Sequence, residues 1–253
     1  MITIDLNCDM GESFGRYTLG SDEELMPYLS SINLACGFHA GDPMVIQQTV
    51  QTAVKYNLAV GAHPGYPDLK GFGRRKIEMS PEEVEAMVLY QIGALWGFLR
   101  SDRIEMTHVK PHGALYNQAA QEVRLANAIA RSVRRFSKEL ILVGLAGSAL
   151  IEAGLECGLN VANEGFVERG YQANGRLVPR GMEGAVVHDP IIAARQAIQL
   201  AMDGITVHKG EMAMNVKIDT LCIHGDSPNA LEIVRTVRSA LEETGYKIQR
   251  LSG

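Results

Sequence analysis

Short apolar segments alternate along this chain with longer stretches that have the periodicity of amphipathic helices. Most of the short segments are too continuously apolar for strands with one face in water, which indicates a sheet covered on both faces. A strand followed by a helix, repeated seven or eight times, predicts parallel strands joined by crossover helices. The expected strands are ITIDLNC (2–8), INLAC (32–36), LAVGA (58–62), EMTHVK (105–110), LILVGLA (140–146), NVANEGF (160–166), either GAVVH (184–188) or ITVH (205–208), and TLCIH (220–224).

The expected helix starts are marked by a capping residue followed by proline. Ser80 precedes Pro81 and lies three residues before Glu83, so a capping box is expected there. In Asp42-Pro43 and Asp189-Pro190 the aspartate is expected to cap the helix that follows.

Two architectures fit parallel strands with crossover helices: a closed barrel and an open, doubly wound sheet. The chain has 253 residues, of which 46% are hydrophobic, enough to bury a full core. No G-x-G-x-x-G sequence follows the first strand, and no change in composition marks a domain boundary. We therefore predict an α/β fold in which residues 1–253 form a single (β/α) barrel of seven or eight strands.

Composition and charge exclude several classes of protein. The net charge is −5 and the charges are interspersed, so no nucleic-acid partner is expected. No segment approaches 18 consecutive apolar residues, so no membrane span is expected. The first residues carry Asp5 and no basic segment, which is unlike a signal peptide, and the four cysteines form no C-x-x-C pair. A cytoplasmic protein with buried thiols is the expectation.

Two segments interrupt the alternation of strand and helix. Residues 64–79 (PGYPDLKGFGRRKIEM) and 167–183 (VERGYQANGRLVPRGME) are rich in turn-forming residues. Loops of this length in a compact domain are usually lids or binding loops, so we expect both of them beside the functional site.

Histidines and carboxylates stand where the predicted strands give way to loops. In parallel α/β folds the site lies at the carboxyl ends of the strands, so residues far apart in the sequence are expected to meet on one rim. The polar residues at these ends are Asn7, Asp9, Glu12, His39, His63, His112, His224 and Asp226.

Lys110 lies two residues before His112 in the sequence HVKPH. Extended residues two apart point to the same side, so His108, Lys110 and His112 are expected to share a face. A lysine at such a rim can hold a carboxylate or phosphate, or polarise a carbonyl.

The residue types at this rim favour hydrolysis by water over nucleophilic catalysis. The chain has no catalytic-cysteine signature, so general acid–base catalysis by histidine and aspartate is the simpler interpretation. A divalent metal is also compatible with aspartate and histidine, but the spacing does not identify its ligands. No Walker sequence is present, so this chain is not expected to bind a nucleotide.

Several long motifs resemble those of the LamB/YcsF family. They run in order through essentially the whole chain: DLNCDMGE (5–12), NLACGFHAGDP (33–43), GAHPGYPD (61–68), GFGRR (71–75), VKPHGALYN (109–117) and LVPRG (177–181). One departure is visible near Glu164, where the family often reads E-x-F-A-D-R and this chain reads EGFVER. Glu168 thus stands where aspartate is usual.

The resemblance implies a distorted barrel related to the glycoside hydrolase/deacetylase fold. It also implies one component of an ATP-dependent 5-oxoprolinase, which opens 5-oxo-L-proline to L-glutamate together with two other subunits, with ATP as co-substrate of the complex. Deacetylases of this fold use an Asp-His-His metal site, and Asp9, His39 and His63 would be the nearest equivalents here.

The roles at the rim are assigned as alternatives. His112 or His63 would be the base, and Asp9 or Asp226 would orient it. Lys110, Arg74 or Arg75 would bind the carboxylate or phosphate of the substrate. The further candidates for the site are His39, Asn7, Glu12, Glu164 and His224. A free-standing metal-dependent deacetylase or amidohydrolase and a non-catalytic binding subunit remain as alternative functions.

Overall fold

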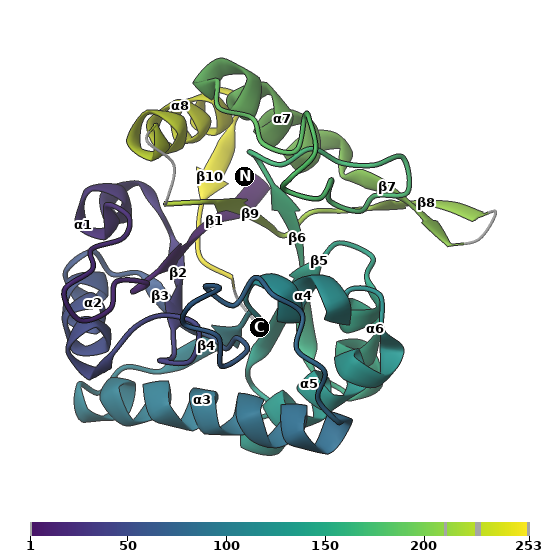
Figure 1. The fold of residues 1–253 in the computed structure, drawn as a ribbon. Coiled ribbons are helices and arrows are strands. Elements are labelled where there is room, and N and C mark those ends of the chain that lie inside the picture. Colours follow the sequence, from purple (N-terminus) through teal and green to yellow (C-terminus); the bar gives the residue numbers. More distant parts are fainter. Residues whose placement is uncertain (1, 210–211, 226–228, 252–253) are drawn as a thin grey trace.

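Seven parallel strands close into a barrel in the computed structural model, which describes residues 2–209, 212–225 and 229–251 (Figure 1). Neighbouring strands follow the order of the chain until the last one, which pairs with both the sixth and the first strand and so closes the barrel. The strands are β1 (Ile2–Met10), β2 (Ser31–Ala35), β3 (Ala59–His63), β4 (Met106–Val109), β5 (Ile141–Leu145), β6 (Asn160–Phe166) and β9 (Thr220–Ile223). The prediction of a closed (β/α) barrel is therefore confirmed, with seven strands.

Helices surround the barrel and bury their apolar faces against it. They are α1 (Asp22–Leu25), η1 (Met26–Tyr28), α2 (Pro43–Lys55), α3 (Pro81–Ser101), α4 (Gly113–Ala119), α5 (Val123–Phe136), α6 (Ala149–Glu156), α7 (Pro190–Asp203) and α8 (Ala230–Glu243). None of these helices combines the length and the apolar character that crossing a lipid bilayer would take, as far as the described residues go.

The predicted caps are present at the helix starts. The Glu83 backbone N–H donates to Ser80 Oγ at 3.2 Å, and the Ser80 N–H donates to Glu83 Oε2 at 2.7 Å, which completes the capping box. The side chains of Asp42 and Asp189 each accept two backbone N–H groups at the starts of α2 and α7. Asp42 also accepts the N–H of Gly15, so it ties the loop after β1 to α2.

Neither of the two alternatives for the strand after β6 contributes a strand to the barrel. Residues 184–188 form no strand; Val186 makes only an isolated bridge to Arg169. Residues 205–209 form β7 (Ile205–Lys209), but β7 pairs antiparallel with β8 (Met212–Val216) in a separate hairpin that projects from the barrel. β8 begins three residues after the end of β7 and pairs with it. In the barrel, β6 therefore pairs directly with β9. The short strand β10 (Tyr246–Ile248) extends the sheet beside the start of β1.

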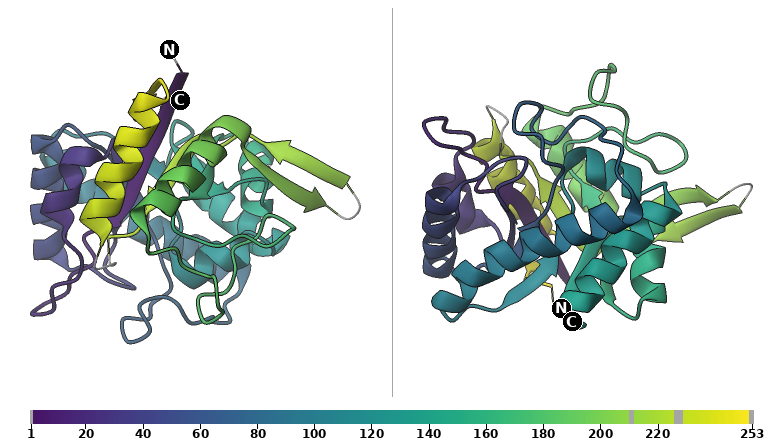
Figure 2. Two further views of the ribbon diagram at one scale, coloured as in Figure 1. Left: turned by 90° about the horizontal axis from the view of Figure 1, so that it is seen from above. Right: turned by 60° about the horizontal axis from the view of Figure 1, so that its bottom comes forward.

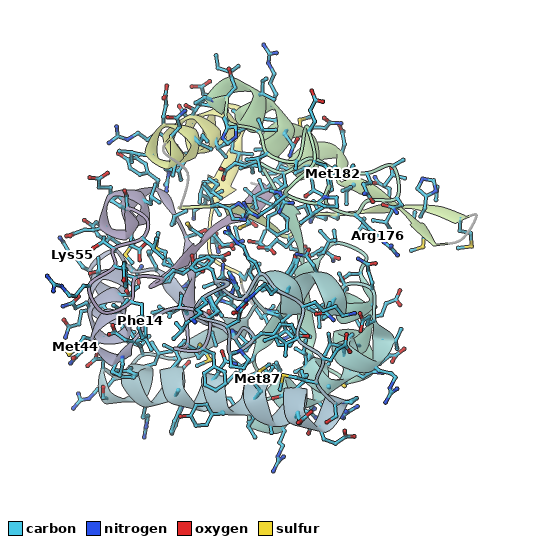
Figure 3. The ribbon with its side chains drawn as sticks, in the orientation of Figure 1. Phe14, Met44, Lys55, Met87, Arg176 and Met182 are labelled. Carbon is cyan, nitrogen blue, oxygen red and sulfur yellow. The ribbon has the colours of Figure 1, made fainter. Side chains whose placement is uncertain are left out.

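Loops 64–79 and 167–183 project from the end of the barrel opposite to both chain termini (Figure 2). Since β1 begins near the terminal end, the loops lie at the carboxyl ends of the parallel strands. Arg176 and Met182, labelled in Figure 3, belong to the second of these loops. Both long loops therefore border the rim at which the sequence placed the functional residues.

Candidate active site

Polar side chains fill the barrel interior in layers, beginning with Asp5. Its carboxylate accepts hydrogen bonds from Ser31 at 2.8 and 2.9 Å and from Thr220 at 2.5 Å, and these residues lie on the neighbouring strands β2 and β9. Burial raises the pKa of Asp5, although these hydroxyl donors oppose the rise. Asp5 thus joins three strands below the site.

Asn33 connects the next layer to the rim. Its Nδ2 donates to Asn7 Oδ1 at 2.7 Å and to Asp9 Oδ1 at 2.9 Å, while His108 Nε2 donates to its Oδ1 at 2.8 Å. Burial lowers the pKa of His108 to about 3, so this imidazole is neutral. A Cβ at Gly61 would overlap the His108 ring, which explains the glycine in the middle of β3.

Lys110 lies at the centre of a buried network of charges. Its Nζ donates to Glu164 Oε1 at 2.7 Å and to Asp9 Oδ1 at 2.9 Å, and it also contacts Asn7 Oδ1 and Cys222 Sγ at 3.3 and 3.2 Å. Burial alone would lower the pKa of Lys110, but the charges of Asp9, Cys222 and Glu164 raise it well above its ordinary value. The ammonium is therefore held by the protein itself, with its three N–H groups facing four acceptors.

Asp9 is kept ionised by the same network. Burial would raise its pKa, but the interactions with His63 and with the Lys110 ammonium hold the pKa of Asp9 well below its usual range. Its Oδ2 lies 3.3 Å from His63 Nε2. One carboxylate oxygen thus faces the lysine and the other faces an imidazole at the rim.

Three imidazoles meet above this network. The rings of His39 and His112 stack in parallel with centroids 3.8 Å apart, and His63 stands edge-on to both at 5.5 and 4.9 Å. Burial, followed by the charges of neighbouring histidines, lowers the pKa of His39 well below its ordinary value and that of His112 to about 3. His39 and His112 are therefore neutral.

Two backbone carbonyls fix the orientation of His63 and His112. His63 Nδ1 donates to the Lys110 carbonyl at 2.7 Å, and His112 Nε2 donates to the Phe72 carbonyl at 2.8 Å. The other two nitrogens, His63 Nε2 and His112 Nδ1, face each other at 3.0 Å. The neutral His112 ring donates from Nε2, so its Nδ1 carries a lone pair that faces His63 Nε2.

Glycines let loop 64–79 approach these rings closely. A Cβ at Gly65 would lie 2.6 Å from His39 Nδ1, and a Cβ at Gly73 would lie 2.7 Å from His39 Cβ and 2.8 Å from His112 Cδ2. Gly73 also has φ +62°, which side-chain-bearing residues rarely adopt. The GFGRR motif therefore serves to close the loop over the histidines.

A cavity of about 400 Å³ opens over the charged network and the imidazoles. The carboxylates and imidazoles form one part of its lining, and three arginines together with an apolar segment form another. The lining residues include Asp9, Glu12, His63, Lys110, His112, His224, Arg74, Arg169, Arg180, Phe166, Leu177, Val178 and Pro179. A volume of this size suits a small molecule with an anionic group.

The structure brings most of the predicted site residues together at this cavity. Asn7 and Glu164 lie beneath it in the buried network, and His39 lies behind His112 without lining the cavity. Arg75 instead forms an ion pair with Asp68 and is not among the lining residues. Asp226 lies outside the described residues.

Sequence reasoning assigned no role to several residues that shape the site. Tyr116 donates its hydroxyl to Glu164 Oε2 at 2.7 Å. The buried Glu168 accepts the backbone N–H of His224 at 2.7 Å, so the residue that departs from the family pattern positions the end of β9. Arg169, buried in loop 167–183, donates to the carbonyls of Ala185 and Val178, and burial lowers its pKa to about 10. The only signal for Arg169 was its place in a long, predicted binding loop.

The neutral histidines predict a marked loss of stability in acid. The pKa of His112 is about 3 in the folded protein and about 6.5 when unfolded, so between these values the unfolded chain binds a proton that the folded chain does not. Stability from this group is complete above pH 6.5 and falls by up to about 1.4 kcal/mol per pH unit as the pH drops toward 3. Urea unfolding between pH 4 and 7 should show a shallower slope for His112→Gln.

The exposed His188 offers the matched control for this pH experiment. His188→Gln should leave the slope of unfolding free energy against pH unchanged. A His112→Gln variant with the slope of the wild type would contradict a neutral His112 in the folded protein.

The sequence profile of the LamB/YcsF family matches residues 4–253 of the chain. Among curated proteins, the A subunit of 5-oxoprolinase from Symbiobacterium thermophilum is 53% identical over 246 residues, which cover 97% of this chain and 94% of that protein. The A subunit of 5-oxoprolinase from Pyrococcus furiosus is 51% identical over 246 residues, which cover 97% and 96%.

Solved structures show the same relationship at the level of the fold. The crystal structure of the lactam utilization protein from Thermus thermophilus superimposes with a TM-score of 0.91 at 47% identity, covering 99% of this chain and 100% of that one. A family 4 carbohydrate esterase from Streptomyces lividans, solved with acetate, has a TM-score of 0.50 at 12% identity and covers 99% and 93%. The second likeness concerns the fold alone, and it confirms the prediction of a deacetylase-like barrel.

Proposed function

Because the chain belongs to the LamB/YcsF family, we propose that it is the corresponding subunit of a 5-oxoprolinase. The complex would contain two further subunits, act in the cytoplasm, and open the cyclic amide 5-oxo-L-proline to L-glutamate with ATP as co-substrate. The curated relatives that carry this name match almost the whole chain at about half identity, which supports the assignment.

The reaction needs two kinds of chemistry, and we assign only the second to this chain. A five-membered lactam is a poor electrophile, so its carbonyl oxygen must first become a leaving group, for instance by phosphorylation. The sequence contains no Walker loop, and we therefore assign activation to the partner subunits. This chain would supply the hydrolytic step, in which water attacks the activated carbon and the C–N bond breaks as the ring nitrogen takes up a proton. The ring-opened acyl phosphate would then be hydrolysed by a second water, which releases phosphate and glutamate.

The pair of imidazoles at the floor of the cavity is the observation that carries this proposal. His112 Nδ1 carries a lone pair and lies 3.0 Å from His63 Nε2, which in turn lies 3.3 Å from Asp9 Oδ2, so the pair can accept a proton from an attacking water. Because the carbonyls of Phe72 and Lys110 accept the other N–H of each ring, both imidazoles are held in this orientation. We assign proton transfer to this pair and its orientation to Asp9.

Lys110 would act through Asp9 and Glu164, since both carboxylates already occupy its ammonium. The carboxylate of 5-oxoproline would instead meet the arginine side of the cavity. Arg74 is the favoured residue there, because its guanidinium lies over the Phe72 ring at 4.9 Å and lines the cavity. A divalent metal at the rim is compatible with this scheme and is not required by it.

Activity should appear only when all subunits are combined. The purified chain alone should neither hydrolyse ATP nor convert 5-oxoproline, whereas mixing it with its two partner subunits should produce glutamate and ADP together. The measurement is an assay of both products for each combination of subunits.

Two results would replace this function with another one. ATP-independent glutamate formation or amide hydrolysis by the chain alone would favour a free-standing amidohydrolase. Full activity of a complex carrying Asp9→Ala, His63→Ala and His112→Ala together would make the chain a non-catalytic subunit.

A further inference from the structure

We propose that Arg169 and Arg180, both in loop 167–183, bind the phosphoryl group of a phosphorylated form of the lactam substrate. Both arginines line the cavity, and Arg74 lines it as well. The inference rests on the proposed function, in which partner subunits activate the lactam oxygen. It adds the chemical form in which this chain receives its substrate and the residues that hold the activating group.

Arg169 is a buried cation whose hydrogen bonds go to neutral groups. The residue is 5% exposed, and its Nε and Nη2 donate to the carbonyls of Ala185 and Val178 at 3.0 and 2.7 Å. Among the residues that the structure describes, no carboxylate forms an ion pair with its guanidinium, and the adjacent Glu168 accepts the backbone N–H of His224. Buried charges are normally paired, because an unpaired charge loses its hydration without compensation. An anionic ligand would supply the missing negative charge.

The two carbonyls leave part of the Arg169 guanidinium available to a ligand. Nη1 has no hydrogen-bond partner within the described part of the chain, yet it is not one of the enclosed unpaired polar atoms there, which are His39 Nδ1 and Ser148 Oγ. Nη1 is therefore accessible, and the cavity that Arg169 lines gives access to it. Arginine has a rigid planar fork of N–H donors that matches the oxygens of a phosphoryl group, often through two parallel hydrogen bonds.

Positive charge converges on this side of the cavity. Burial lowers the pKa of Arg169 to about 10, and the charges of Arg180 and Arg74 act in the same direction. Cations that repel one another gain most from a ligand with more than one negative charge. A phosphoryl group carries a charge of about −1.5 to −2 at pH 7, whereas 5-oxo-L-proline has a single carboxylate, which is assigned to Arg74. Arg169 and Arg180 thus exceed what the unphosphorylated substrate requires.

The two anionic groups of the activated substrate are attached to the two carbons that flank the ring nitrogen. With the carboxylate at Arg74 and the phosphoryl group at Arg169 and Arg180, the carbon that water attacks is held in the cavity lined by His63 and His112. After ring opening, a second water adds to the acyl carbon, and the C–O bond to phosphate breaks with its electron pair on the leaving oxygen. One proton of this water ends on the phosphate and the imidazole pair accepts the other. The guanidiniums neutralise the charge that develops on the leaving group.

The first test is a calorimetric titration of the isolated chain at neutral pH with inorganic phosphate, acetyl phosphate and acetate. We expect one site that binds the two phosphoryl compounds and binds acetate much more weakly, because acetate has a single charge. Arg169→Gln should weaken the binding of both phosphoryl compounds about 10–100-fold, the loss expected when hydrogen bonds from a charged donor are removed. Arg180 is exposed, so Arg180→Gln should keep the fold and weaken binding about 2–5-fold.

Arg176→Gln is the matched control. Arg176 is an exposed arginine of the same loop, labelled in Figure 3, and is not among the residues that line the cavity, so its replacement should leave the affinities unchanged. If circular dichroism shows that Arg169→Gln does not fold, the affinities of the wild type and of Arg180→Gln decide the matter. The inference is overturned if the wild type binds neither phosphoryl compound more tightly than acetate, or if the folded variants bind both as the wild type does. Tighter binding of ADP than of acetyl phosphate would identify a nucleotide site and overturn it as well.

The second test uses the assembled enzyme, in which loss of this site should uncouple the two products. A phosphorylated lactam that Arg169 does not retain escapes and loses its phosphate to water, so Arg169→Gln should form more ADP than glutamate. The wild type and Arg176→Gln should form equal amounts. An equal fall of both products in Arg169→Gln would contradict the inference and make Arg169 a support of the loop.

The two tests separate this inference from the proposed function. Binding is measured on the isolated chain without ATP. A chain that binds phosphate and acetyl phosphate in an inactive complex would refute the 5-oxoprolinase assignment and leave the phosphoryl site standing. An active complex whose chain binds neither compound would refute the phosphoryl site alone.

Discussion

Replacing His112 with alanine should lower the turnover of the assembled 5-oxoprolinase by about 10²–10⁴-fold, the usual contribution of a positioned general base. Its Nδ1 lies 3.0 Å from His63 Nε2 and borders the cavity, so the variant loses one of the two nitrogens assigned to proton transfer. The effect should fall on kcat, with little change in KM, because the imidazole is assigned to the reaction and not to substrate binding. Steady-state kinetics of glutamate formation measure both constants.

The matched variant His188→Ala, at an exposed position, should retain full turnover. Near-normal turnover of His112→Ala would remove this residue from the mechanism and leave His63 as the candidate.

The position of the rim was accessible from the sequence because it follows from a rule about parallel strands. Each of His39, His63 and His112 stands where a predicted strand gives way to a loop with glycine or proline, and the carboxyl ends of parallel strands lie at one edge. The structure accordingly stacks His39 on His112 although 73 positions separate them, since 112 − 39 = 73. The meeting of these histidines at one rim could therefore be predicted from the local sequence, without knowledge of contacts between residues far apart in the chain.

The polar interior of the barrel could not be predicted in the same way. Asn7, Asn33 and Glu164 occur in runs that otherwise look like buried strands, and a single polar residue in such a run gives no indication of its partner. Their hydrogen bonds join β1, β2 and β6, so the pairing depends on the register of the closed sheet. The register between neighbouring strands is set by the whole closed barrel, so it cannot be inferred from the sequence of one strand.

Two adjacent residues of the same type can also take different positions in the structure, which the sequence did not distinguish. Arg74 lines the cavity while Arg75 pairs with Asp68, and backbone hydrogen bonds from Gly73 to Asp68 and from Arg74 to Gly71 form the turn before these two side chains. Likewise, residues 205–209 have the composition of a barrel strand, yet the nearby β8 offers an antiparallel partner at a much shorter loop length. Both outcomes depend on loop geometry, which cannot be inferred from the amino-acid composition of the segment.

Replacing Lys110 with methionine should destabilise the folded chain by about 3–5 kcal/mol, the range expected when one partner of a buried ion pair is removed. Methionine preserves most of the volume of lysine but leaves the carboxylates of Asp9 and Glu164 buried without their cation. Lys110 is 2% exposed, so water cannot take over the role of the ammonium. Equilibrium unfolding in urea, monitored by circular dichroism, measures the change.

Two further variants show whether charge is the cause. Lys55→Met removes an exposed lysine whose contact with Glu23 is 3.8 Å long, and Figure 3 shows Lys55 at the periphery of the molecule; its expected cost is about 0–1 kcal/mol. In the double variant Lys110→Met/Glu164→Gln one buried negative charge is also removed, so part of the lost stability should return. If the double variant is instead less stable than the wild type by the sum of the effects of Lys110→Met and Glu164→Gln measured singly, then Lys110 stabilises the barrel by packing and not by neutralising Glu164.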